Sequence, residues 1–182
     1  PIYHYLCFEL EQIFFDPDKI NEHPRFDEVK DYSIRILPGN NRDDDKIEEI
    51  KCSALAKRLP KFYVFYMAKM QQFYLETLKI PATKLRFREL SDEERAFYNK
   101  YHYDAELLLD TGWKEVAGLH YRPDHDLSGH EKTSRQDMSI NIEGKKFIPH
   151  VLELSFGVDR NIFALLDICY KEEQERVLFT FP

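Results

Sequence analysis

Segments in which apolar and polar residues alternate are the feature that most restricts what this chain can fold into. Residues 84–90 and 112–122 alternate with a period of two, and residues 7–15 alternate before becoming wholly apolar. Each pattern predicts a β-strand, because successive strand side chains point to opposite faces. Further strands are expected at residues 33–37, at 176–182 and in a hairpin over 139–156 that turns at Glu143-Gly144.

Helical patterns are fewer. Residues 60–80 predict a long buried helix with Pro60 in its first turn, and residues 159–174 predict an apolar-periodic helix. The acidic cluster at 43–45 is expected to begin another helix, since acidic residues favour helix N-termini.

Residues 91–109 begin with Ser91 and Glu94, which match a capping box, the pattern of a helix start. Because the strands do not alternate regularly with helices, an α+β fold is favoured over a doubly wound sheet. We expect an antiparallel β-sheet flanked by helices, in a single domain over residues 1–182, with 24–80 as a candidate helical insertion.

Composition narrows the class of protein. The 182 residues are 43% hydrophobic and carry a formal net charge of −7, which argues against a DNA-coating or histone-like role. No apolar run approaches the ~18 residues of a membrane span, and residues 1–12 lack the features of a signal peptide. We therefore expect a cytoplasmic protein without a membrane partner. The three widely spaced cysteines, Cys7, Cys52 and Cys169, indicate thiols rather than a disulfide framework.

Several common site motifs are missing from the sequence. There is no P-loop, no G-x-G-x-x-G and no G-x-S-x-G elbow. A histidine-rich stretch at 120–130 contains His120, Asp124, His125, Asp126 and His130, but its spacing fits no common zinc pattern. Ordinary loop hydrogen bonding is the simpler interpretation, and a metal-dependent hydrolase using this stretch is a weaker hypothesis.

Two charged residues stand where apolar side chains are expected. Glu153 lies inside the strand-like run "HVLELSF", and Arg160 lies where this run turns into a helix. A buried charge costs several kcal/mol unless it is paired or meets a ligand. Ser155 shares a strand face with Glu153, and a cation at a helix start is disfavoured by the helix dipole. An anionic partner for Arg160 is therefore expected.

Neighbouring strands supply further charges. Glu115 and Arg122 belong to the run "GWKEVAGLHYR", whose Gly118 could let a ligand lie close to the sheet, and the first strand carries Glu9 and Glu11. Carboxylates for an ammonium and guanidinium groups for phosphate would suit a zwitterion and a polyphosphate. The alternative is a set of internal salt bridges.

The same residues form longer motifs. The run "PHVLELSFGVDR" resembles motif 3 of class II aminoacyl-tRNA synthetases, P-x-V-I-E-P-S-F-G-hydrophobic-x-R, in the archaeal and eukaryotic type of glycyl-tRNA synthetase. "GWKEVAGLHYRPDHDLSGH" is similar to that family's G-W-x-E-hydrophobic-x-G-x-A-x-R-x-x-Y-D-L-x-x-H. "FELEQIFFDP" is similar to its E-x-E-x-F-hydrophobic-D-P, and "KLRFREL" to its K-L-R-F-R. The blocks are collinear and span nearly the whole chain.

The resemblance implies an enzyme that activates glycine with ATP, through a glycyl-adenylate, and ligates it to tRNA-Gly. It implies ATP as a substrate, Mg²⁺ carried with the ATP rather than held by a dedicated side-chain cluster, and a homodimer. Motif 1, the start of motif 2 and the anticodon-binding domain are not found in the sequence, so an incomplete catalytic core is expected. The competing hypothesis is a non-catalytic accessory or binding subunit of the same fold.

Site residues follow from the resemblance by position. Arg160 matches the motif 3 arginine that holds the ATP phosphates, and it is the expected catalytic residue. Glu153 and Ser155 match glycine contacts, and Arg122 matches the arginine near the glycine carboxylate. Two further roles fall on the first strand: an acid for the glycine ammonium, Glu11 in preference to Glu9, and Phe8 as the aromatic on adenine.

Overall fold

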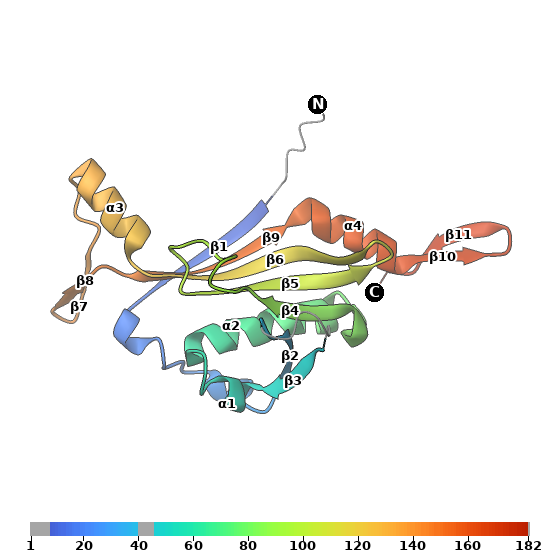
Figure 1. Cartoon of the computed structure of the whole chain (residues 1–182), viewed down its shortest axis with the longest axis horizontal. Helices are drawn as coiled ribbons and strands as arrows, with labels where there is room; N and C mark the ends of the chain where they lie inside the picture. The colour runs from blue at the N-terminus through green and yellow to red at the C-terminus, as the bar shows by residue number, and fades with distance from the viewer. Residues whose placement is uncertain (1–7, 40–45, 182) are drawn as a thin grey trace.

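The computed structural model describes residues 8–39 and 46–181 (Figure 1). In these ranges seven strands form one sheet in the order β1-β9-β6-β5-β4-β2-β3. Their bounds are β1 Phe8–Phe15, β2 Ser33–Leu37, β3 Glu48–Lys51, β4 Leu85–Glu89, β5 Tyr101–Leu109, β6 Gly112–Arg122 and β9 His150–Gly157. The helices are α1 Cys52–Leu55, α2 Lys61–Gln72, α3 His125–Ser134 and α4 Val158–Cys169. The α+β class predicted from the sequence is confirmed.

The sheet is mixed rather than wholly antiparallel. Strand β2 runs parallel to β4, while the other neighbouring strands pair antiparallel. A parallel pair needs a long crossover, and α1 and α2 supply it between β2 and β4. Residues 24–80 therefore contribute strands β2 and β3 to the same sheet as well as helices.

The two faces of the sheet differ in chemistry, and the pairing register fixes which residue belongs to which. One face, here called the apolar face, carries the alternate residues Phe87, Tyr103, Leu119, Leu152 and their neighbours, all within the buried core. Helix α2 packs on it, and the Tyr63 hydroxyl donates a hydrogen bond to the Leu119 carbonyl at 2.6 Å. The opposite face, here called the polar face, carries the residues in between, including Asp104, His120 and Glu153.

Three predicted helices differ from the structure. One half of the Ser91 capping box forms, with the Glu94 carboxylate accepting from the Ser91 backbone N–H, yet residues 92–99 make turns and Tyr101–Leu109 is strand β5 instead of a helix. The cluster at 43–45 lies outside the described residues, and Glu48–Lys51 is a strand that leads directly into the short α1. Helix α4 ends at Cys169, because the chain turns there into β10.

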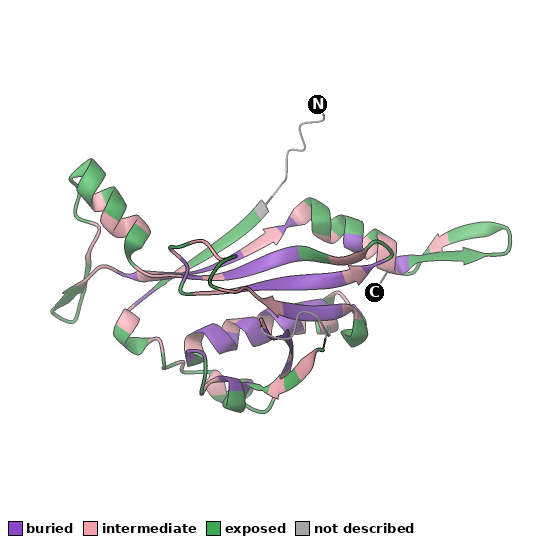
Figure 2. Ribbon diagram, viewed as in Figure 1, coloured by how far each residue is buried: buried purple, intermediate pink, exposed green. Residues whose placement is uncertain are grey.

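Two small hairpins project from opposite ends of the molecule (Figure 1). One is β7 Ile140–Ile142 with β8 Lys145–Phe147, and the other is β10 Tyr170–Glu173 with β11 Arg176–Phe179. Figure 2 shows that burial concentrates in the central strands and α2, whereas α3 and the hairpins are mostly exposed. The described helices fall short of the length and apolar character that crossing a membrane requires.

Candidate functional site

A buried ion pair joins β6 to β9 on the polar face. Arg122 Nη2 lies 2.8 Å from Glu153 Oε1, and Glu153 is only 5% exposed. A second guanidinium nitrogen, Nη1, lies 3.3 Å from Asp126 at the start of α3, and the ring of Tyr98 lies 5.1 Å from the guanidinium carbon. Arg122 Nε is buried without a hydrogen-bond partner among the described residues. This nitrogen is a donor left over after the protein's own contacts are made.

Strand β1 completes this end of the site with Gln12. Its side-chain amide donates a hydrogen bond to Glu153 Oε2 at 2.9 Å, and Gln12 pairs with Glu153 in register. Glu11 pairs with Leu154 and therefore points to the apolar face, near Tyr66 of α2. The expectation that Glu11 shares a surface with Glu153 is wrong, because the register assigns neighbouring β1 residues to opposite faces.

His120 lies at the centre of the polar face. It pairs in register with Glu153, and its Nε2 lies 3.3 Å from the hydroxyl oxygen of Ser155. The imidazole covers Gly118, where an added Cβ would come within 2.5 Å of Nε2. The open space above Gly118 that the sequence led us to expect for a ligand is thus occupied by His120. Burial lowers the pKa of His120 to about 3, aided by the nearby His102 and Arg122, so the ring is neutral at physiological pH.

The polar face continues over β5 and β4 as a chain of ion pairs. Arg86 and Arg88 contact Glu106 at 2.7 and 3.1 Å, and Arg88 also contacts Asp104 at 2.9 Å. His102 Nε2 lies 3.0 Å from Asp104. The segment 90–100 covers part of this network, with Asn99 in contact with His120 and Glu94 with Arg88. The internal salt bridges that the sequence left open as the alternative are therefore present on this part of the polar face, because its buried charges have protein partners.

Arg160 lies at the opposite end of β6 from Arg122. Its Nη1 contacts both the carboxylate and the carbonyl oxygen of Glu115 at 3.2 Å, and 44% of its side chain is exposed. Arg160 and Glu115 line a groove of about 660 Å³ together with Trp113 and Lys114. Glu115 is the anionic partner that the sequence led us to expect. Seven positions of β6 separate it from Arg122, roughly 23 Å along an extended strand.

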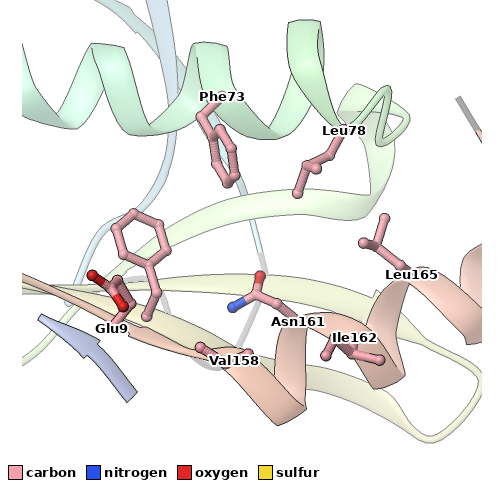
Figure 3. A pocket seen from close by; sticks show the side chains of 8 residues that line it. Glu9, Phe73, Leu78, Val158, Asn161, Ile162 and Leu165 are labelled. Atoms are coloured by element: carbon pink, nitrogen blue, oxygen red, sulfur yellow. The ribbon is translucent and has the colours of Figure 1, made fainter. Parts of the chain in front are cut away.

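Two of the candidate first-strand residues cannot be placed on the polar face: Glu9 lies on the apolar face, and the side chain of Phe8 lies outside the described residues. Glu9 lines an open cavity of about 460 Å³ on the apolar face, otherwise bounded by α4, by Phe156 of β9 and by the segment 73–78 that follows α2 (Figure 3). The lining there is almost wholly apolar, including Phe73, Leu78 and Ile162, and is unsuited to phosphate. The backbone of Phe8 pairs with Gly157, but its side chain lies outside the described residues, so the adenine contact stays a prediction.

The histidine-rich stretch is divided by the fold. His120 belongs to β6, whereas His125, Asp126 and His130 belong to α3. Within residues 8–39 and 46–181 no group of three or more His, Cys, Asp or Glu side chains is arranged to hold a metal ion. The hydrolase hypothesis has no support from this arrangement.

The structure brings together Arg122, Glu153 and Ser155, as predicted, and adds Gln12 and His120, which sequence reasoning missed. A signal for Gln12 was present. Counting back from Asp16-Pro17 along the motif E-x-E-x-F-hydrophobic-D-P puts its two acids at positions 10 and 12, where this chain has leucine and glutamine. His120 also departs from its motif, which has alanine there, but the sequence had suggested only a metal role for it and gave no indication of its contact with Ser155.

Comparison with known proteins identifies relatives of the chain. It is 39% identical over 140 residues to the glycine–tRNA ligase of Pyrococcus furiosus, covering 74% of this chain and 24% of the relative. It is 34% identical over 155 residues to the glycine–tRNA ligase of Lachnoclostridium phytofermentans, covering 80% of this chain and 32% of the relative. The searched family models give no match.

A third relative shows how the lengths differ. The glycine–tRNA ligase of Methanococcus vannielii is 24% identical over 261 aligned positions, which cover 93% of this chain and 45% of the relative. Since the alignment is longer than the chain, the relative contains segments without a counterpart here. The chain spans 24% to 45% of the length of these relatives.

Proposed function

The chain is homologous to a segment of the glycine–tRNA ligases, and from this premise we propose that its polar face holds glycine for ATP-dependent activation and ligation to tRNA-Gly. The proposed fold is that of a class II aminoacyl-tRNA synthetase core, incomplete in this sequence. Glycine, ATP and tRNA-Gly are the proposed substrates and partners, in a cytoplasmic homodimer.

The Arg122–Glu153 pair is the observation that carries this proposal. Adjacent positive and negative groups are complementary to a zwitterion, whose carboxylate would meet the guanidinium and whose ammonium would meet the carboxylate. Arg122 keeps a buried Nε without a partner among the described residues, so it has a donor to offer. Ser155 adds a hydroxyl two residues from Glu153 on the same strand face.

Arg160 is the proposed phosphate-binding residue at the far end of β6. Its guanidinium is half exposed beside a groove, which leaves it accessible to a polyanion. In the proposed reaction the glycine carboxylate attacks the α-phosphate of ATP and pyrophosphate leaves. Arg160 would neutralise phosphate charge, and the Arg122 side would hold the attacking carboxylate in place. Mg²⁺ would arrive with ATP.

A second candidate function is a non-catalytic accessory or binding subunit. Both carboxylate oxygens of Glu153 already accept contacts, from Arg122 and Gln12. The two acid positions of the first-strand motif hold Leu10 and Gln12. A site with fewer carboxylates has less to offer an ammonium, and this favours the accessory hypothesis.

Glycine-dependent exchange of pyrophosphate into ATP tests the proposal, with the chain and with Arg160→Ala. We expect exchange in the parent and its loss in Arg160→Ala, with the circular dichroism spectrum retained. Arg176→Ala, in the exposed β10–β11 hairpin, is the matched control and should leave exchange unchanged. Equal exchange in Arg160→Ala and parent contradicts the role of Arg160. A parent that shows neither exchange nor calorimetric glycine binding favours the accessory subunit.

A further inference from the structure

We propose that His120 determines which amino acid the polar face accepts beside Glu153 and Ser155, by filling the space into which a substituent on the glycine α-carbon would extend. This inference rests on the proposed function, because it assumes that glycine binds against Glu153 and Ser155. It concerns a residue for which the sequence motifs assign no role.

The strand register places His120 beside any amino acid that binds to both Glu153 and Ser155. His120 stands directly opposite Glu153 in the β6–β9 pairing, and its ring extends over Gly118 to the hydroxyl of Ser155. The imidazole therefore spans the distance between the two β9 side chains on the same face. A molecule held by both of them lies against the ring.

The space beneath the ring is closed. Gly118 has no side chain, and a methyl group in its place would come within 2.5 Å of His120 Nε2 and 3.2 Å of Ser155 Oγ. The imidazole is thus seated on the backbone of β6 and cannot retreat toward the sheet. A side chain on the bound amino acid would have to displace the ring or clash with it.

Neighbouring groups hold the ring in place. His120 Nδ1 lies 3.3 Å from the side-chain amide of Asn99, which is 5% exposed, and the His102 ring centre lies 4.0 Å away. Asp104 in turn contacts His102. The groups that face His120 are therefore His102, Asn99, Ser155 and the charged Arg122 and Asp104. A neutral ring fixed in this way excludes bulk without repelling an ammonium group.

Calorimetric titration with glycine, L-alanine and D-alanine tests the proposal on the chain and three variants. His120→Ala removes the ring, and we expect the affinity for one alanine enantiomer, the one whose methyl group points at the ring, to rise at least about tenfold relative to glycine. His120→Asn should give a smaller gain. His120→Phe keeps a ring and should hold the ratio within about threefold of the parent.

His130→Ala is the control, because His130 is an exposed histidine of α3 outside the network. Should His120→Ala fail to fold, the His120→Asn and His120→Phe pair still separates loss of the ring from its retention. Glycine binding by the parent with the same glycine-to-alanine ratio in His120→Ala or His120→Asn overturns this inference alone. No glycine binding by the parent overturns the proposed function, and the inference with it.

Discussion

The two ends of β6 carry the same kind of pair in opposite surroundings. At one end Arg122 and Glu153 are joined at 2.8 Å, with side chains that are 26% and 6% exposed. At the other end Arg160 and Glu115 are joined at 3.2 Å with side chains that are 44% and 51% exposed. Burial makes the first pair costly to break, whereas solvent screens the second.

This difference suits the two proposed ligands. A small zwitterion gains most from a desolvated pair of opposite charges whose geometry is already fixed. A polyphosphate must displace the carboxylate of Glu115 or share Arg160 with it, and an exposed pair can be opened at little cost. Chemical similarity between the two pairs therefore does not make them equivalent.

The largest expected effect is at the buried end. Glu153→Ala leaves Arg122 without its closest partner and should lower the free energy of unfolding by about 3 kcal/mol, the lower end of the range for a buried pair, because Arg122 keeps its contact with Asp126. Chemical denaturation followed by circular dichroism measures this. The double variant Arg122→Met, Glu153→Leu should recover most of the loss, because neither member of the Arg122–Glu153 pair then remains without the other, and Asp126, which also loses Arg122, is 38% exposed. A Glu153→Ala variant as stable as the parent would show that the pair is not buried in solution.

Acidification gives an intermediate effect through His120, which pairs in register with Glu153. The pKa of His120 is about 3 in the folded chain and near 6.5 when exposed, so the unfolded chain takes up a proton that the folded chain does not. Unfolding is thus favoured as pH falls below 6.5, by up to about 1.4 kcal/mol per pH unit.

His120→Phe isolates this contribution, since His23 and His150 also have lowered pKa values because of burial. Its unfolding free energy should fall less steeply between pH 6.5 and 4 than that of the parent. Parallel curves for the two proteins would mean that His120 titrates normally in the folded chain.

The smallest effect is expected at the exposed end. A double-mutant cycle with Arg160→Ala and Glu115→Ala should give a coupling of about 0.2–1 kcal/mol, because both side chains are substantially solvated. The coupling should vanish in 1 M salt, where the screening length is about 3 Å. A coupling of several kcal/mol that survives salt would place this pair in the same class as Arg122–Glu153.

Much of the fold could be predicted because the alternation of apolar and polar residues in a strand can be recognised without knowledge of the strands that pair with it. The alternating segments became β1, β4 and β6, and the apolar segment after Pro60 became α2. Two of the failures share a cause: Glu48–Lys51 pairs with β2 and residues 170–173 pair with β11, and such pairings with other parts of the chain override local helix signals.

The site was predicted in part for the same reason. Glu153, Ser155 and Arg122 belong to two strands that are neighbours in the sheet, so their motifs mark one surface. Glu11 was misplaced because a strand face changes with every residue, and a shift of one position reverses it. His120 became visible only when its ring was seen to cross Gly118, a contact that depends on the rotamer of one side chain.

The position of β1 at the sheet edge has a consequence for how the chain reaches its fold. Gln12 and Glu153 are 141 positions apart in the chain yet share a hydrogen bond. At ribosomal rates of about 5–20 residues per second, the first strand leaves the ribosome roughly 7–28 seconds before its partner is made. Throughout that interval Ile13, Phe14 and Phe15 lack their β9 neighbours. The nascent chain therefore exposes an apolar segment to which chaperones can bind.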